Sequence, residues 1–399
     1  DDGVVSPGGV GYDINCGVRL VRTRLFFEDV KHRIGDLVRA LFAAIPCGVG
    51  AKGAIAKLSA KDVGRVLERG ARWAIDEGYG EPGDLERTEE KGRLAGADPA
   101  LVSDLAIERG AAQLGTLGSG NHFLEIDVVG EIHRPEVAAR FGLEPGSVVF
   151  LVHSGSRGLG YQVCDDALET MGRAMDRYSI RVPDRQLACA PIDSAEGRAY
   201  LAAMAAAANF AWANRQVMAG LAEQAFAAAL GVGPATLRFA LVYDVCHNVA
   251  KIEEHVVDGR RRRLCVHRKG ATRAFGPGHP DLPPHLRPLG QPVIIPGDMG
   301  RYSFLLLGTA GAMEQTFGTT CHGAGRVMSR AQAKKVGRGL DLVRDLAGRG
   351  VTVRAQSLRG LAEEMPWAYK DVADVVDVVD RAGIARRIAR LKPLVVVKG

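Results

Sequence analysis

Residues 147–158 read SVVFLVHSGSRG. After Ser147, the first part is apolar and rich in β-branched side chains, which is typical of a buried strand. The strand ends at His153, and a turn of serine, glycine and arginine follows it. Strand ends are rigid and turns admit solvent, so a histidine at such a junction is a common member of a catalytic or metal site. The alternative is a histidine held by structural hydrogen bonds alone.

The same arrangement of strand, histidine and polar turn occurs twice more. His247 follows a strand candidate at 237–243, and His122 leaves the glycine-rich turn 118–121 to enter another strand. Alternation along that strand is expected to send His122 and Leu124 to one face. Three strand ends therefore offer an imidazole beside a turn.

The remaining pattern decides the fold class. The Asp258-Gly259 turn between two short runs predicts a β-hairpin. There is no internal repeat and no regular alternation of strands with helices, which favours an α+β fold with central β-sheets flanked by helices over a doubly wound parallel sheet. We expect one catalytic domain over 1–399, with the proline-rich segment 277–288 as a surface loop. Further strands are expected at 293–295 and 304–307, hairpin arms at 255–257 and 264–267, and amphipathic helices at 27–45, 61–78, 195–230 and 327–345.

The composition is that of a globular protein with a basic balance. The 399 residues are 47% hydrophobic and 25% charged, enough to bury a large core, and this excludes an intrinsically disordered chain. The net charge of +6 favours polyanionic partners such as nucleic acid.

The seven cysteines form an odd set without a Cys-x-x-Cys pair, which argues against a disulfide scaffold and a structural zinc ribbon and favours reduced thiols in a cytoplasmic protein. The longest apolar stretch, near residue 200, is interrupted by Asn209, Asn214 and Arg215, so no membrane span is expected. The chain opens at Asp1 without a leader pattern, and we expect it to be a fragment.

A fourth glycine-rich turn contributes two further metal-ligand candidates. Asp13 and Cys16 lie three residues apart, so that a carboxylate and a thiolate could face one ion, with the sulfur able to bridge two. Together with His122, His153 and His247, they form a mixed oxygen, sulfur and nitrogen set that fits a catalytic manganese or zinc site better than a closed structural zinc site. An Asx turn followed by a buried cysteine is the alternative.

The segment CHGAGR, residues 321–326, leads into a helix start. Free backbone amides, glycines and Arg326 would form an anion-binding cradle around the imidazole of His322. An imidazole in that place can attack a phosphorus centre and carry a phosphoramidate. A helix-capping turn with an incidental histidine is the alternative. The segment PGDMG, residues 296–300, supplies a second turn suited to a nucleotide.

Several of these motifs together resemble the RtcB family of RNA ligases. They are SPGGVGYDINCG at 6–17, GNHF at 120–123, HSGSRG at 153–158 and HGAGRVMSR at 322–330, in the family's order and ending with VVVKG at 395–399. The resemblance spans almost the whole chain. It implies a ligase dependent on GTP and two Mn²⁺ ions, which joins RNA ending in a 2′,3′-cyclic phosphate or 3′-phosphate to RNA with a 5′-hydroxyl, in tRNA splicing and RNA repair. RNA, such as tRNA halves, is the implied partner, and an archease-type activator is a further candidate.

The resemblance also implies the order of steps and the metal ligands. His322 attacks the α-phosphate of GTP, expels pyrophosphate and holds GMP, which then passes to the RNA 3′-phosphate. The 5′-hydroxyl attacks this activated phosphate and releases GMP. Cys16 would bridge the two ions. The implied metal ligands are Asp13, Cys16, His122, His153 and His247.

The guanylate pocket is assigned in the same way. Glu125 would accept hydrogen bonds from the guanine edge, and Arg157 and Arg326 would suit RNA or triphosphate oxygens. The pocket would draw on Asn121, His122, Phe123, Leu124, Glu125, His247, Asn248, Pro296, Gly297, Asp298, Met299, Ser303, His322, Gly323, Ala324, Gly325, Tyr369 and Lys398.

Two departures from the family are visible. Its N-terminal portion, with a Met-Pro-Asp-x-His type motif, would lie before Asp1. The family usually has serine where Asp298 stands, and a carboxylate facing phosphate would be repulsive, so Asp298 is expected to point away or to contact a sugar hydroxyl or the base.

Other functions remain open from the residues. One is a two-metal phosphoesterase that forms a phosphohistidine at His322 without a nucleotide, and another is a non-catalytic RNA-binding protein. The basic strip 260–263, followed by His267, Arg268 and Lys269, is a candidate surface for the RNA backbone, with a solvated surface turn as the alternative.

Overall fold

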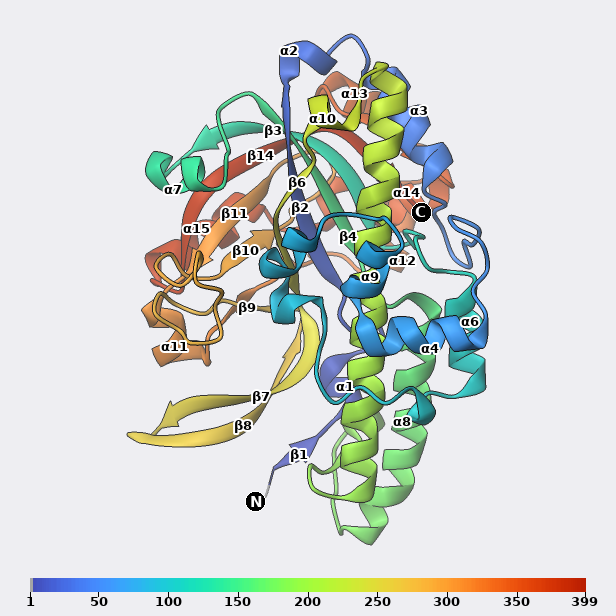
Figure 1. Cartoon of the computed structure of the whole chain (residues 1–399), viewed down its shortest axis with the longest axis vertical. Coiled ribbons are helices and arrows are strands. Elements are labelled where there is room, and N and C mark those ends of the chain that lie inside the picture. Colours follow the sequence, from blue (N-terminus) through green and yellow to red (C-terminus); the bar gives the residue numbers. More distant parts are fainter. Residues whose placement is uncertain (1–2) are drawn as a thin grey trace.

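The computed structural model describes residues 3–399, so the expectation drawn from Asp1 lies outside the described residues. An eight-stranded sheet forms the centre of the molecule, which confirms the α+β class (Figure 1). Its strands pair antiparallel except for β13, which runs parallel to β14. In spatial order they are β10 (Pro292–Ile295), β11 (Ser303–Gly308), β14 (Ala385–Lys398), β3 (Phe123–Ile132), β4 (Ser147–Ser154), β2 (Gly17–Phe26) and β6 (Ala240–Cys246), with β13 (Thr352–Ala355) beside β14.

Strand alternation gives the sheet two buried faces. In β4, Phe150 and Val152 pack toward α9 (Ala195–Leu230) and α3 (Ile34–Ala44). The intervening Val149 and Leu151 join the core on the other face, which α7 (Pro135–Arg140) and the proline-rich loop cover. Because both faces are covered, β4 is apolar along nearly its whole length instead of alternating.

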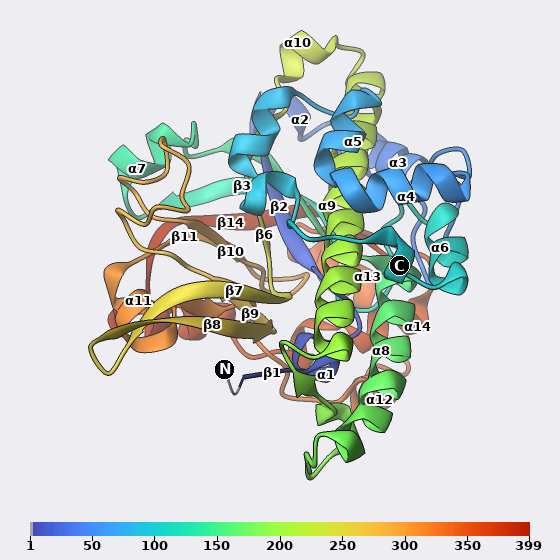
Figure 2. The same cartoon turned by 60° about the horizontal axis from the view of Figure 1, so that its bottom comes forward.

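The long helix α9 confirms the helix expected over 195–230. Most of its middle is buried, and its many alanines allow close packing of neighbouring helices. Beside it lie α4 (Ala60–Arg69), α5 (Ala71–Asp76) and α8 (Arg157–Arg177), and α6 (Asp104–Ala111) packs against α4 and α8 (Figure 2). The sequence did not predict α8.

Three of the expected helices are each broken in two. The helix expected at 61–78 divides at Gly70, whose φ of +57° and whose closeness to the Gly92 carbonyl suit only glycine. The others divide into α2 (Phe27–Val30) and α3, and into α12 (Arg330–Val336) and α13 (Leu342–Gly348). The strand expected at 237–243 begins only at Ala240, because Leu237 ends the short helix α10 (Pro234–Leu237).

The predicted hairpin is present and longer than expected. Its strands β7 (Asn248–Val257) and β8 (Arg260–Lys269) pair along their whole length. Asp258 and Gly259 both have positive φ, +50° and +74°, which is typical of the tight turns that join antiparallel strands. The hairpin extends away from the central sheet (Figure 1), with residues 260–263 exposed.

The other elements are short. No helix among residues 3–399 has both the length and the apolar character needed to cross a bilayer. The remaining strands are β1 (Val4–Val5), β5 (Ala190–Pro191), β9 (Ala271–Arg273) and β12 (Thr319–Cys321). The remaining helices are α1 (Pro7–Val10), α11 (Ala310–Thr316), α14 (Leu358–Glu363) and α15 (Val372–Arg381), with 3-10 turns at Pro82–Arg87, Glu89–Gly92, Pro99–Leu101, Arg185–Leu187 and Pro366–Ala368.

Candidate active site

Neighbouring antiparallel strands bring the metal-ligand candidates to one edge of the sheet. Cys16 directly precedes β2, and His247 directly follows β6. Gly17, the first residue of β2, is in register with Ser154 and with Cys246. In the same way, Phe123 at the start of β3 is paired with His153 near the end of β4. The strand pairing therefore gathers four side chains that lie far apart in the sequence.

The ligand atoms of these side chains form two groups that share Cys16. In one group, the Asp13 Oδ2 atom lies 2.7 Å from His122 Nε2, which lies 3.5 Å from Cys16 Sγ. In the other, Cys16 Sγ lies 3.3 Å from His153 Nε2, and this atom lies 3.2 Å from His247 Nε2. Each group has three donors within 4.8 Å of one another. A shared thiolate with oxygen and nitrogen donors on either side fits a pair of metal ions.

The protonation states of the oxygen and nitrogen ligands suit metal binding. Burial and the nearby Asp13 raise the pKa of the Cys16 thiol well above its usual range, so its thiolate would depend on the charge of a bound ion. The Nδ1 atom of His122 lies 2.9 Å from the Leu117 carbonyl oxygen, which can only accept a hydrogen bond, so Nδ1 carries the hydrogen. The lone pair of Nε2 is then available to a metal ion. Burial lowers the pKa of His153 and of His247, which keeps both imidazoles neutral. Burial opposes ionisation of Asp13, but His122 outweighs it and lowers the pKa of Asp13 to about 2.

A buried arginine on α9 holds the loops that carry these ligands. Arg215 Nη1 donates to the carbonyl oxygens of Asn15 and Ser154, at 2.7 and 2.9 Å. Its other nitrogens bond Asp244, with 2.8 Å between Nη2 and Oδ1. The approach is so close that a Cβ on Gly17 would lie 3.1 Å from the guanidinium carbon. Arg215 thus fixes the spacing between the Asp13–Cys16 turn and the end of β4.

A cavity of about 330 Å³ adjoins the two metal-ligand groups, and His153 is part of its lining. Five of the residues expected in the guanylate pocket do not line this cavity: His122, Leu124, His247, Asn248 and Ser303. Leu124 packs in the core under α9 instead, because the face of β3 that lines the cavity carries Phe123 and Glu125. The expected residues that do line it are Asn121, Phe123, Glu125, Pro296, Gly297, Asp298, Met299, His322, Gly323, Ala324, Gly325, Tyr369 and Lys398.

Asn248 has a supporting role between the turns. Its Nδ2 atom donates to the Asp13 carbonyl at 3.1 Å, and its Oδ1 atom accepts from the Gly270 amide at 2.9 Å. The side chain therefore ties the metal-ligand turn to the segment that carries Gly270.

His322 lies in the wall of the nucleotide-sized cavity with one ring nitrogen fixed. Pairing of β12 with β9 sets Cys321 opposite Ala271, and this places the His322 Nδ1 atom 2.7 Å from the Gly270 carbonyl oxygen. Nδ1 therefore carries the hydrogen, and Nε2 keeps its lone pair. Burial lowers the pKa of His322, which favours the neutral, nucleophilic form. Its ring centroid is 4.6 Å from that of His247, a metal-ligand candidate.

Comparison with known proteins agrees with this arrangement. The profile of the family described as tRNA-splicing ligase RtcB matches residues 1–399. The chain belongs to the RtcB family. It is 55% identical over 399 residues to the tRNA-splicing ligase RtcB of Archaeoglobus fulgidus, and the match covers 100% of this chain and 83% of that protein. The ligases of the same name from Thermococcus kodakarensis and Aeropyrum pernix are 52% and 49% identical, each covering 100% of this chain and 82% of the relative. RtcB membership confirms the resemblance and makes the chain an enzyme, a ligase.

Two carboxyl groups, those of Glu125 and Asp298, line the 330 Å³ cavity in which the guanylate pocket is expected. Burial, and then the nearby Asp127, raises the pKa of Glu125 well above its usual range, whereas Lys398 opposes this shift. Asp298 lines the cavity with a buried side chain. Its Oδ1 atom accepts from the Gly300 amide at 2.9 Å, and Arg301 Nε lies 3.4 Å from Oδ2. Local contacts thus partly neutralise the carboxylate that stands in place of the usual RtcB serine.

The two arginines expected at RNA or triphosphate oxygens line different cavities, and both donate to protein acceptors. Arg157 Nε donates to Thr116 Oγ1 at 3.1 Å, and its Nη2 atom donates to the Gly48 carbonyl oxygen at 3.3 Å. Arg157 begins α8 and lines a further cavity, of about 880 Å³, together with Asp13 and His122. Arg326 lines the nucleotide cavity, but its nitrogens donate to the Tyr369 hydroxyl and to the carbonyl oxygens of Met328 and Glu363. In this structure Arg326 therefore braces the cavity wall.

The sequence reasoning did not single out Arg330 and Glu364, although Arg330 lies within the quoted RtcB motif 322–330. Arg330 lines both the nucleotide cavity and the 880 Å³ cavity. Its Nε atom lies 3.2 Å from Glu364 Oε1, and Glu364 also accepts from the Tyr369 hydroxyl. Glu364 lies in no motif, so only the structure reveals this link between the two cavities.

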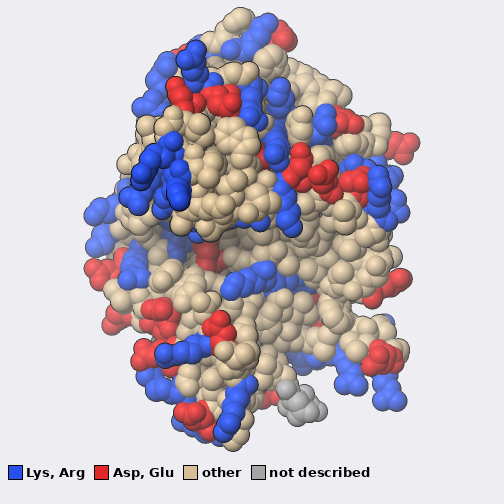
Figure 3. All heavy atoms as spheres, turned by 180° about the vertical axis from the view of Figure 1, so that it is seen from behind, with Lys and Arg blue, Asp and Glu red and all other residues tan. Residues whose placement is uncertain are grey.

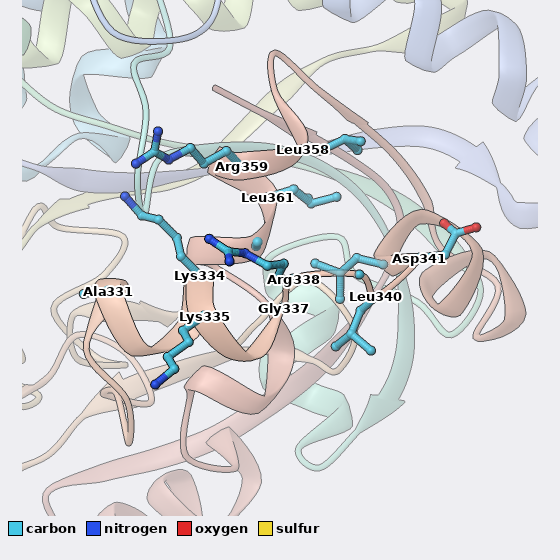
Figure 4. A pocket seen from close by; sticks show the side chains of 13 residues that line it. Ala331, Lys334, Lys335, Gly337, Arg338, Leu340, Asp341, Leu358, Arg359 and Leu361 are labelled. Carbon is cyan, nitrogen blue, oxygen red and sulfur yellow. The ribbon is translucent and has the colours of Figure 1, made fainter.

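A third cavity, of about 1040 Å³, lies between α12 and α14, and no residue expected in the site lines it (Figure 4). Lys334, Arg338 and Arg359 reach toward the same side of it, and Arg359 also lines the 880 Å³ cavity. The molecular face seen in Figure 3 is hollowed near its middle, with Lys and Arg gathered around the hollow.

Proposed function

We propose that this RtcB ligase joins RNA ends by a GTP- and Mn²⁺-dependent reaction in which His322 carries GMP. The coarser function, an RNA ligase of tRNA splicing, follows from the family. The finer proposal rests on one observation: the Gly270 carbonyl fixes His322 Nδ1 as a donor and leaves Nε2 as a nucleophile in the wall of a nucleotide-sized cavity. The RNA ends proposed are a 2′,3′-cyclic phosphate or 3′-phosphate and a 5′-hydroxyl.

GMP would be attached to His322 in the first step and transferred to RNA in the second. Nε2 attacks the α-phosphorus of GTP, a nitrogen–phosphorus bond forms, and the bond to pyrophosphate breaks. The ring becomes positively charged, and the Gly270 carbonyl oxygen stabilises that charge through Nδ1–H. Where the RNA ends in a 2′,3′-cyclic phosphate, water first adds to phosphorus and the bond to the 2′-oxygen breaks, which leaves a 3′-phosphate. An oxygen of the RNA 3′-phosphate then takes GMP from Nε2. Finally the 5′-hydroxyl oxygen attacks the RNA phosphate, and GMP leaves.

The two ligand groups would hold the metal ions. Asp13, Cys16 and His122 would bind one ion, and Cys16, His153 and His247 the other. Bound Mn²⁺ would supply positive charge against the phosphate oxygens. The protein groups keep the donor atoms ready, since the Leu117 carbonyl holds His122 Nε2 toward the site and Arg215 holds the adjoining loops.

The nucleotide cavity suits guanine because its inner end offers acceptors. The guanine edge presents hydrogen-bond donors that a carboxylate such as Glu125 can accept from, and the same position of adenine lacks this pair. Because burial and Asp127 raise the pKa of Glu125, its charged form would be favoured only when the guanine donors face it, with the nearby charge of Lys398 acting in the same direction. Lys398 is held in place by the hydrogen bond from its Nζ atom to the Gly120 carbonyl, at 2.9 Å. The glycine turn 323–325 and Tyr369 would enclose the rest of the nucleotide.

RNA contacts belong to the same proposal. Arg157 would meet phosphate oxygens at the mouth of the site, and Arg326 would do so if its protein partners were exchanged for a ligand. The exposed strip 260–263 on the hairpin would bind the RNA backbone at a distance from the reaction. Activation by an archease-type protein stays a prediction from the resemblance.

Incubation with α-labelled GTP tests the proposal. We expect label retained on the denatured protein and absent from the His322→Ala variant. A wild-type protein that acquires no label yet cleaves phosphoesters would contradict the proposal and support the two-metal phosphoesterase. The non-catalytic RNA-binding alternative is wrong, since the family consists of enzymes.

A further inference from the structure

The 880 Å³ cavity contains a pair of stacked tyrosines, one half-buried and one exposed, that the proposed reaction does not use. Tyr12 and Tyr161 lie with ring centroids 4.6 Å apart and planes inclined by 24°. Both line the 880 Å³ cavity, and Asp13 and His122 line the same cavity. Tyr161 is 50% exposed, so its outer face meets solvent and not protein.

The chain fixes this pair at a short distance from the metal-ligand groups. Tyr12 directly precedes Asp13, so its backbone cannot move away from that ligand. Tyr161 follows Arg157 by four residues on α8, and residues at this spacing share one face of a helix. Arg157 and Tyr161 therefore both face the cavity, and Tyr12 supports Tyr161 from behind.

The remaining lining supplies groups that suit phosphates. Arg109 and Gln113 of the preceding segment lie in the same cavity as the two tyrosines. Gln113 Oε1 accepts from the Gly158 amide at 2.9 Å, so the hydrogen-bond donors of its amide nitrogen are not used in this contact. Cations beside an exposed aromatic face are the combination by which proteins bind single-stranded nucleic acid, with the charges on the backbone and the ring under a base.

We propose that Tyr161, supported by Tyr12, is a stacking platform for a nucleobase next to the ligation junction. This inference rests on the proposed function, because it needs RNA ends at the metal-ligand groups. Stacking uses the face of the base and leaves its hydrogen-bonding edge unread, so the platform would accept any of the four bases. It would hold the terminal nucleotide while Arg157 meets a phosphate.

Three variants test the platform. For Tyr161→Ala we expect the KM for RNA to rise by about tenfold, the loss typical of one stacked base, with a smaller change in kcat. Tyr161→Trp should restore the KM because it restores a stacking face. Tyr178→Ala, at the far end of the same helix, is the matched control and should leave the KM unchanged. Equal KM values for wild type and Tyr161→Ala, or failure of Tyr161→Trp to rescue, would overturn the inference.

A second measurement needs no variant. RNA ends that carry 2-aminopurine as the terminal base, on the 3′-phosphate strand or on the 5′-hydroxyl strand, should lose fluorescence on binding to the wild-type protein through stacking. Quenching of one probe supports the platform, and quenching of neither overturns it. Labelling of His322 by GTP alone separates the two proposals: an unlabelled wild type contradicts the proposed function, whereas normal labelling with an unaltered RNA KM in Tyr161→Ala contradicts only the platform.

Discussion

The Gly270 carbonyl oxygen and the His322 Nδ1 atom are 2.7 Å apart, and Gly270 is the residue that permits this approach. Its φ is +63°, and a Cβ at this position would lie 3.1 Å from His322 Cε1. The backbone of one hairpin end thus determines which nitrogen of the imidazole is free to react.

Substitution Gly270→Ala should slow labelling of His322 by GTP at least tenfold, because the new methyl group displaces the imidazole. Gly259→Ala is a matched control, since Gly259 also has positive φ but open space around it. Both changes strain the backbone and should lower the free energy of unfolding by about 1 kcal/mol or more. Equal labelling rates in the two variants would show that the contact does not position His322.

Substitution Cys16→Ala should remove both metal ions and abolish ligation, because Cys16 belongs to both ligand groups. RNA affinity should be largely retained. Metal content after equilibration with Mn²⁺ and gel filtration, measured by atomic spectroscopy, checks this. Cys189→Ala, a buried cysteine outside the site, should keep full metal content. Retention of two ions, or of ligation, by Cys16→Ala refutes the shared-ligand assignment.

Substitution Arg215→Met should lower the free energy of unfolding by about 3–5 kcal/mol, since it leaves the buried Asp244 short of one partner. Metal affinity should fall as well, because the carbonyl oxygens of Asn15 and Ser154 lose their common donor. Denaturant unfolding and Mn²⁺ titration measure the two effects. Arg198→Met, near the exposed start of the same helix, should change neither; normal metal affinity in Arg215→Met would disprove its positioning role.

Substitution Glu125→Gln should reduce the preference for GTP over ATP by roughly ten- to a hundredfold, as expected for the loss of a charged acceptor worth about 1.5–3 kcal/mol. Competition between the two labelled nucleotides for His322 measures the preference. Glu131→Gln, at the exposed end of the same strand, serves as the control. An undiminished preference in Glu125→Gln would place guanine recognition elsewhere.

Acid should destabilise the protein through Glu253. Burial opposes its ionisation, but His255 and Arg268 outweigh this and lower the pKa of Glu253 to about 2. Because the pKa of Glu253 is lower in the folded protein than in the unfolded chain, where it is 4.5, its ionisation stabilises the fold at pH values above 4.5. This contribution to the free energy of unfolding is lost as the pH falls from 4.5 toward 2. In Glu253→Gln, the loss of stability between pH 4.5 and 2 should be shallower than in the wild type, although the variant starts less stable at neutral pH. An unchanged slope in acid denaturation curves would contradict this.

The five candidate metal ligands could be predicted from the sequence, and the structure brings them together in two groups, because each lies beside a recognisable strand end or glycine turn. His153 ends an apolar strand, and strand pairing then accounts for its meeting with Cys16. The long helix and the hairpin were also predictable, from apolar residues recurring at three- and four-residue steps and from the Asp258-Gly259 turn.

Other parts could not be predicted from local patterns. The strand β14 mixes basic and apolar residues, and its place in the sheet depends on pairing with distant β3 and β11. The contact of Gly270 with His322 involves a backbone carbonyl, which no side-chain motif reveals. The sequence alone shows Arg215 only as a polar residue within a long apolar helix, because its hydrogen-bond partners Asp244 and Asn15 lie far away in the sequence.

Mass spectrometry of the protein after incubation with GTP and Mn²⁺, without RNA, tests the central claim most directly. We predict the added mass of one GMP on the peptide that contains residues 321–326, joined to His322, and its loss when 3′-phosphate and 5′-hydroxyl RNA ends are supplied. No adduct, or an adduct on another residue that supports ligation, would contradict the role assigned to His322.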